Sequence, residues 1–128
     1  MLIINEGELA RNAQIVKKLW GTEYILLNND RYCLKFLKLT PGFRSSVHMH
    51  KKKDETFIGI SGSARLHFYN PKGESEAVVG IGPGTRKRIN AGQYHSFEAS
   101  SEAWIMEVST SHKDEDVTRL VESRKLEQ

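Results

Sequence analysis

Two histidines two residues apart, His48 and His50, are followed five residues later by a carboxylate, Glu55. Residues i and i+2 of a β-strand point to the same face, so both imidazoles can reach one point. Glu55 comes after a short loop and can return to that point. Neutral imidazoles with a carboxylate suit zinc, iron, manganese, nickel or cobalt. The segment therefore predicts a metal site; for the two histidines alone, a polar strand end at the surface is the alternative.

A fourth ligand is expected from a distant part of the chain. His95 is the candidate, because it closely follows a turn signal at Gly92 in the segment NAGQYHSF. The loop between the first ligands carries Lys51, Lys52 and Lys53. Those lysines are either a solvated turn or a basic rim that meets an anionic ligand.

Many short apolar segments separated by turn residues indicate an antiparallel β-sandwich or barrel. Strands are expected in the segments 23–39 (a hairpin with its turn at 28–30), 45–50, 55–60, 62–70 and 102–110. A short C-terminal helix is predicted over about 114–125, because Val117, Leu120 and Val121 have helical spacing with acidic residues before them. The prediction is one all-β domain over residues 1–128.

Composition limits the function classes. With 38% hydrophobic and 27% charged residues in 128, the chain is typical of a globular domain, and no apolar run is long enough to span a bilayer. The N-terminal residues lack signal-peptide character, which favours a cytoplasmic protein. The single cysteine, Cys33, excludes an internal disulfide. The net charge is only +3, and the basic runs at 51–53 and 86–88 have no interleaved aromatics, so neither nucleic acid nor membrane is an expected partner.

Two segments have the spacing of a known pair of motifs. The first, over 42–62, reads Gly42-x5-His48-x-His50-x4-Glu55-x6-Gly62, and the second, over 84–99, reads Gly84-x5-Asn90-x-Gly92-x2-His95-x3-Ala99. They resemble the two motifs of the cupin family, with Asn90 where proline is usual and Ala99 where asparagine is usual. The resemblance implies a jelly-roll barrel (a double-stranded β-helix). It also implies one divalent metal on His48, His50, Glu55 and His95, with two coordination positions open. His67 and His112 lie off the motifs and are predicted to be ordinary surface residues.

The flanking segments narrow the resemblance to type II mannose-6-phosphate isomerases and related small sugar isomerases. The shared features are Trp20-Gly21, Lys35, Pro41-Gly42, Lys53, and a C-terminal group of Glu107, Val108, Asp114, Asp116, Val117 and Arg119. The chain departs after Arg119, where these isomerases continue with an aspartate and then Gly-Arg. Here the sequence is LVESRKLEQ, without glycine.

Candidate catalytic residues are Lys35 and Glu107, each flanked by apolar residues in a predicted strand. The alternatives are a lysine that reaches the surface and a carboxylate paired with a lysine at the barrel rim. Lys53, Arg86 and Arg88 are the candidates for binding a substrate phosphate.

The resemblance implies an aldose–ketose isomerase that binds a sugar or sugar phosphate and works through an enediolate. An iron-dependent cupin dioxygenase and a non-catalytic ligand-binding cupin are the alternatives, because one fold hosts many chemistries. A homodimer is expected by analogy with other cupins.

Overall fold

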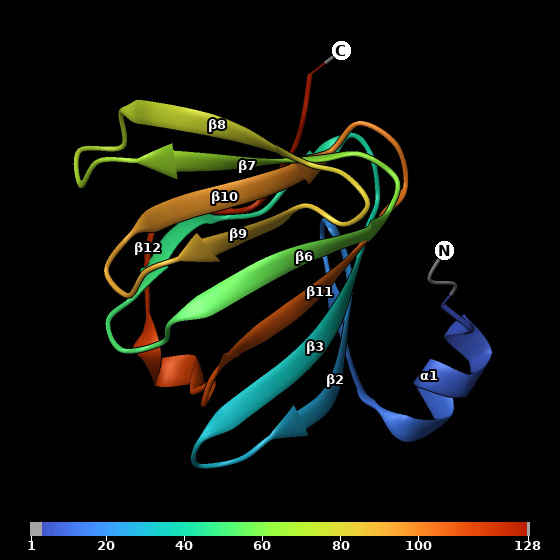
Figure 1. The fold of residues 1–128 in the computed structure, drawn as a ribbon. Coiled ribbons are helices and arrows are strands. Elements are labelled where there is room, and N and C mark those ends of the chain that lie inside the picture. The colour runs from blue at the N-terminus through green and yellow to red at the C-terminus, as the bar shows by residue number, and fades with distance from the viewer. Residues whose placement is uncertain (1–3, 128) are drawn as a thin grey trace.

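Two antiparallel sheets face each other in the structure, a computed structural model that describes residues 4–127 (Figure 1). The first sheet has the order β1 (Gln14–Lys18), β2 (Gly21–Asn28), β3 (Tyr32–Leu39), β11 (Ala103–Thr110), β6 (Glu55–Ser61) and β9 (Arg86–Ile89). The second has the order β12 (Val117–Val121), β5 (Val47–His50), β10 (Tyr94–Ala99), β4 (Phe43–Arg44) and β13 (Arg124–Lys125), with β7 (Ala64–Tyr69) joining β10 to β8 (Ser75–Ile81). A helix, α1 (Glu6–Asn12), and a 3₁₀ turn, η1 (Asp114–Asp116), complete the described elements. The all-β prediction is confirmed.

Strand β3 illustrates why these segments are strands. Its side chains alternate, with Cys33, Lys35, Leu37 and Leu39 buried and the residues between them more exposed. That period of two matches a sheet with one face on the core. The turn before β3 is held by the Asn29 side chain, which accepts hydrogen bonds from the backbone N–H groups of Arg31 and Tyr32.

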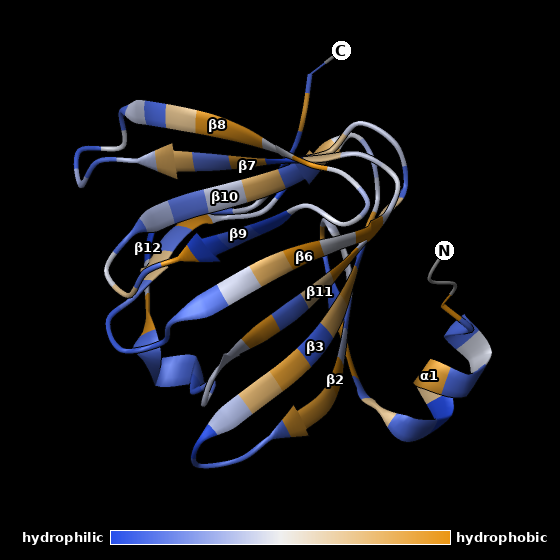
Figure 2. Cartoon of the chain, in the orientation of Figure 1, coloured by the Kyte–Doolittle hydropathy of each residue, from blue (hydrophilic) through white to orange (hydrophobic). Residues whose placement is uncertain are grey.

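The core fills the space between the sheets at one end of the barrel. Its buried members are Trp20, Leu37, Leu39, Phe57, Ala64, Leu66, Phe68, Ile81, Ile89, Phe97, Ala99, Ala103 and Ile105. Figure 2 shows bands of hydrophobic residues along β2, β3 and β6 and a mainly hydrophilic β9. The core forms one boundary of a cavity, because Trp20, Leu37, Phe57 and Phe97 also line it; most of the other lining side chains are polar.

Helix α1 covers part of the outer face of the first sheet (Figure 1). Asn5 caps the helix by accepting a hydrogen bond from the Glu8 N–H, as an N-cap residue should. Leu9 and Ala10 pack against a small buried cluster of Tyr24, Ile60 and Trp104. Neither this helix nor any other in the described residues has the length and apolar character needed to cross a membrane.

The predicted C-terminal helix over 114–125 is wrong. Only Asp114–Asp116 form a helical turn, and β12 then pairs antiparallel with β5, with Val117 opposite His50 and Arg119 opposite His48. Pairing with the open edge of β5 satisfies backbone groups that a helix would have satisfied internally. Leu120 and Val121 remain 40% and 46% exposed, so the apolar side chains that have helical spacing are not buried against the barrel.

The backbone requires glycine at position 62, the last glycine of the first motif. Its φ is +73°, and a Cβ placed there would lie 2.1 Å from the carbonyl oxygen of Glu102. Only glycine avoids both the strained left-handed conformation and this backbone clash. The motif glycine therefore shapes the turn between β6 and β7 and does not belong to the ligand set.

Candidate metal centre and its cavity

The three motif histidines converge. His48 and His50 lie on β5, and His95 lies opposite His48 on β10, so strand pairing brings the two motifs together. Ligand atoms of His48, His50 and His95 all lie within 4.8 Å of one another. Glu55, the first residue of β6, places its Oε2 3.4 Å from the Nε2 of His50 and 3.9 Å from the Nε2 of His95.

Backbone carbonyls orient two of the imidazoles. The Nδ1 of His48 lies 2.9 Å from the Ser46 carbonyl oxygen, and the Nδ1 of His95 lies 2.9 Å from that of Gln93. A carbonyl oxygen only accepts, so each Nδ1 carries the hydrogen and each Nε2 keeps a lone pair. This is the usual support for metal-binding histidines.

The protonation chemistry of the cluster also fits a cation. Burial lowers the pKa of His50 to about 3 and that of His95 to about 4, and it places the pKa of His48 well below its ordinary value. The imidazoles are therefore neutral, the form that binds metals. Burial, together with the nearby charge of Glu107, raises the pKa of Glu55 to about 8. The ionised form of Glu55 is thus unfavourable without a cation beside it.

Three atoms of the cluster have unmet bonding capacity. Within residues 4–127, the Nε2 of His95, the Oε2 of Glu55 and the Nδ1 of His50 are buried without a hydrogen-bond partner. Unpaired buried polar atoms are costly, and a divalent cation between Glu55 and His95 would satisfy the first two. The four residues predicted from the motifs therefore fit a metal of the zinc, manganese, iron, nickel or cobalt type.

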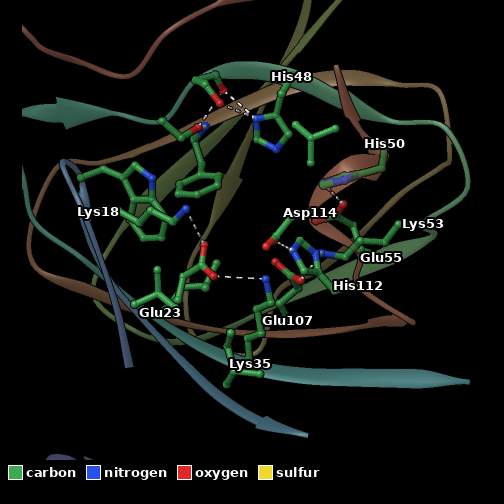
Figure 3. A pocket seen from close by; sticks show the side chains of 18 of the residues that line it. Lys18, Glu23, Lys35, His48, His50, Lys53, Glu55, Glu107, His112 and Asp114 are labelled. Carbon is green, nitrogen blue, oxygen red and sulfur yellow. Dashed lines mark hydrogen bonds and ion pairs between the residues drawn. The ribbon is translucent and has the colours of Figure 1, made fainter. Parts of the chain in front are cut away.

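The cluster opens into a cavity of about 590 Å³. Figure 3 shows that His48 and His50 line one side of it and that Glu23, Lys35 and Glu107 line the opposite side. The wall also includes Trp20 and Phe97 from the core, together with amide side chains and serines. The cavity is therefore lined by both apolar and polar side chains.

Lys53 and Glu107 form a buried ion pair on this wall. The Nζ of Lys53 lies 2.7 Å from the Oε2 of Glu107, and the two side chains are 2% and 6% exposed. Burial alone would raise the pKa of Glu107, but Lys53 and Lys35 outweigh it and lower that pKa to about 2. Burial opposes the charge of Lys53 too, but Glu107 and Glu55 raise its pKa above the ordinary value. Both groups are therefore charged.

Lys35 is also buried and paired. Its Nζ lies 3.1 Å from the Oε1 of Glu23 on the neighbouring strand β2, and its side chain is 3% exposed. Lys18, on β1, stands 4.0 Å from the other oxygen of Glu23. Lys35 and Glu107, the two candidate catalytic residues, both lie on the cavity wall.

The two predicted arginines lie elsewhere. Arg86 and Arg88 are exposed residues of β9, and neither lines the cavity. Arg88 instead makes two hydrogen bonds to the Asp54 carboxylate, at 3.0 and 2.7 Å. Their strand belongs to the first sheet, where alternate residues face outward, and only Ile89 is buried.

Sequence reasoning missed His112 and the role of Asp116. His112, predicted as a surface residue, lines the cavity with its Nδ1 3.1 Å from the Nζ of Lys53. Burial, then the charges of Lys35 and Lys53, lower its pKa. The Asp116 carboxylate accepts hydrogen bonds from the backbone N–H groups of Lys51, Lys52 and Lys53, at 3.0–3.2 Å. The acidic cluster at 114–116 was the available signal, but it was interpreted as a helix start.

Solved structures with a similar fold include two oxalate decarboxylases. A variant of oxalate decarboxylase from Bacillus subtilis superposes with a TM-score of 0.73 and 21% identity, over 86% of this chain and 31% of that chain. The formate complex of the Lactobacillus farciminis oxalate decarboxylase gives 0.69 and 22%, over 86% and 34%. At these identities the likeness concerns the fold.

Two facing antiparallel sheets around a cluster of three histidines and a glutamate define a cupin, as the motifs predicted. Within that class, the chain belongs to the family described as "Mannose-6-phosphate isomerase C-terminal", whose model matches residues 5–122. A curated relative, the D-lyxose/D-mannose isomerase of Thermosediminibacter oceani, is 29% identical over 113 residues. That alignment covers 72% of this chain and 62% of the relative, so the chain spans less than two thirds of the relative's length.

Proposed function

We propose that this cupin is a metal-dependent aldose–ketose isomerase acting on a sugar or sugar phosphate. The observation that carries the proposal is a charged carboxylate, Glu107, buried on the wall of the same cavity as the histidine cluster. An isomerase of this type needs a base beside a site that stabilises negative charge on oxygen. The family match and the curated isomerase support the same activity.

The residues that would hold the metal are His48, His50, Glu55 and His95. A divalent metal held there would supply Lewis-acid stabilisation of the negative charge that develops on sugar oxygens during isomerisation. The backbone carbonyls of Ser46 and Gln93 keep the histidine side chains oriented for this.

Glu107 is the best candidate for the base. In the direction from aldose to ketose it takes a proton from C2 and returns it to C1, while the hydroxyl proton moves from O2 to O1. Lys53 keeps Glu107 in the ionised form that a base requires, and the same pairing lowers its pKa to about 2, so Glu107 gains basicity when a bound sugar draws Lys53 away from it. Lys35 was the other candidate. Because it is paired with Glu23, it has a binding role in this proposal: Lys35 donates to sugar hydroxyls and Glu23 accepts from them.

An unphosphorylated sugar is the substrate form that the cavity favours. Both fully buried cations on its wall, Lys35 and Lys53, already have carboxylate partners. A phosphate dianion that bound to either lysine would displace its partner and leave Glu23 or Glu107 buried without a counter-charge, which is costly. A phosphate would therefore have to use an exposed cation that also lines the cavity, such as Arg119. The name of the curated relative, a D-lyxose/D-mannose isomerase, agrees with a free sugar.

The test is turnover by the metal-loaded protein on a panel of aldopentoses, aldohexoses and their phosphates. We expect isomerisation of at least one free aldose, and loss of that activity in Glu107→Gln and in His50→Ala. Glu8→Gln, an exposed change on α1, is the matched control. Full metal occupancy without turnover of any sugar would refute the isomerase proposal. Oxygen consumption with Fe(II) would favour a dioxygenase, and sugar binding without turnover a binding protein.

We further propose that the protein forms a homodimer through the outer face of the first sheet. On β3 and β11, Leu34 and Phe36 stand opposite Val108 and Met106, so the four apolar side chains are neighbours. Val108 is 43% exposed, and the other three are only partly buried. Phe36 and Met106 also pack in the cluster that α1 covers, so the area proposed as the interface lies beside the helix, around Leu34 and Val108.

A further inference from the structure

His112 is held firmly at the cavity edge between β11 and η1. Its backbone N–H donates to the Oδ1 of Asn28, and the Nδ2 of Asn28 donates to its carbonyl oxygen, at 3.0 and 2.9 Å. Its side chain is 16% exposed. Two hydrogen bonds from the Asn28 side chain therefore hold the backbone of His112, and this limits the positions that its ring can take.

The contacts of the ring define its hydrogen positions. The Nδ1 lies 3.1 Å from the Nζ of Lys53, and the Nε2 lies 3.1 Å from the Oδ1 of Asp114. An ammonium group has only donors, so Nδ1 must accept, whereas a carboxylate accepts, so Nε2 must donate. His112 is then a neutral imidazole with its hydrogen on Nε2.

Lys53 is consequently held from two sides. One hydrogen of its ammonium group goes to Glu107 at 2.7 Å and a second to His112 at 3.1 Å. Within residues 4–127 these are its two side-chain partners, which leaves the third hydrogen for the cavity that Lys53 lines. Glu107 alone would permit rotation about the single contact, because an ammonium group has no fixed plane.

We infer that His112 is a positioning residue, whose Nδ1 fixes the Lys53 ammonium group so that one N–H points at a bound sugar oxygen and Glu107 stays in place. The kinetic consequence rests on the proposed isomerase function; the hydrogen bond itself does not. Figure 3 shows His112 between Asp114 and the Lys53–Glu107 pair.

The hydrogen bond is tested without any substrate. In protein labelled with ¹⁵N-histidine and loaded with diamagnetic Zn²⁺, long-range ¹H–¹⁵N correlation spectra at neutral pH report which ring nitrogen of His112 carries hydrogen. We expect hydrogen on Nε2 alone, and a changed Nδ1 signal in Lys53→Met but not in Lys52→Met, since Lys52 is an exposed neighbour in the same loop. A hydrogen on Nδ1, or an unchanged signal in Lys53→Met, would overturn the inference.

The role is tested by two substitutions of different chemistry. Asparagine keeps an acceptor near the place of Nδ1, whereas phenylalanine keeps the ring and removes the acceptor. We expect His112→Phe to lower kcat by about tenfold or more with a smaller change in KM, since a slightly misplaced catalytic group costs on this order. His112→Asn should recover most of kcat, and His67→Phe, outside the cavity, should leave it unchanged.

The outcomes separate the two proposals. Equal losses in His112→Phe and His112→Asn, or no loss in either, would refute the positioning role while isomerisation by the unmodified protein stood. If the unmodified protein turns over no sugar, the isomerase proposal fails, and the spectra still decide whether His112 fixes Lys53.

Discussion

The Oε2 of Glu55 lies 3.9 Å from the Nε2 of His95, and within residues 4–127 neither buried atom has a hydrogen-bond partner. Unpaired buried polar atoms are costly, and a cation between these two would bond to both. We therefore expect Zn²⁺ or Mn²⁺ to raise the melting temperature of chelator-treated protein, because a ligand that binds only the folded state adds about 2.7 kcal/mol at a hundredfold excess over its Kd.

The metal-dependent rise should be absent in His95→Ala and Glu55→Gln and retained in His67→Ala. His67 pairs with Glu98 outside the cavity and serves as the histidine control. Differential scanning calorimetry with and without metal measures the effect, and metal analysis gives the stoichiometry. A metal response that survives both substitutions would contradict this ligand set.

The Lys53–Glu107 pair gives a prediction for stability. Removing one partner of a buried ion pair leaves an uncompensated charge and costs about 3–5 kcal/mol, whereas replacing both by apolar residues is often neutral. We expect Lys53→Met and Glu107→Leu each to destabilise by about that amount, and the double variant to recover much of the loss without recovering activity. Urea unfolding at a fixed zinc concentration measures all three; additive losses would show that the two residues are not coupled.

The contact between helix α1 and the first sheet should become less stable in acid. The hydroxyl of Tyr24 and then the ammonium group of Lys38 donate to Glu6 and lower its pKa below the ordinary 4.5. A carboxyl group with a lowered folded-state pKa stabilises the fold fully above its unfolded value and loses this contribution as pH falls through the folded one.

The difference in the free energy of unfolding between the unmodified protein and Glu6→Gln should therefore be constant from neutral pH down to about the pKa of Glu6 in the unfolded chain. At lower pH this difference should shrink. Tyr24→Phe, which removes the first donor, should reduce that pH dependence. Denaturant titrations across the acid range measure both. A difference that grows on acidification would have the wrong sign.

The outer apolar face predicts a change of assembly. Val108→Lys places a charge in the centre of the proposed dimer interface and should convert a dimer to a folded monomer, as judged by light scattering after size exclusion. Val78→Lys is the control, because Val78 is 53% exposed on β8 of the other sheet. A monomeric unmodified protein would refute the interface.

Only part of the candidate metal site follows from local geometry. His48 and His50 share a strand face by period alone, whereas Glu55 and His95 were added by the motif spacing of the cupin resemblance, and the structure brings the three histidines together through pairing of β5 with β10. Lys53 and Glu107 were selected individually, but their pairing depends on how β6 lies against β11, which no local pattern specifies. Confirming that pairing required the folded chain.

His112 and the C-terminal segment could not be predicted for the same reason. Val117, Leu120 and Val121 have a spacing that satisfies a helix, but β12 pairs with the open edge of β5, and tertiary pairing outweighs a weak local preference. Asp116 was interpreted as a residue that favours a helix start, yet its carboxylate bonds to the lysine loop. Polar residues in turns can serve a distant backbone as well as their own.

The bond between Asp116 and the loop has a consequence for the order in which the protein assembles. Lys51 and its partner Asp116 are 65 residues apart in the chain, and the loop they hold spans the interval between His50 and Glu55. Contacts between such distant residues close late in folding, because the chain entropy of the intervening loop must be lost first. The loop between His50 and Glu55 therefore has its native hydrogen bonds only once Asp116 has reached it, so these two residues depend on the C-terminal segment although they occur before the middle of the sequence.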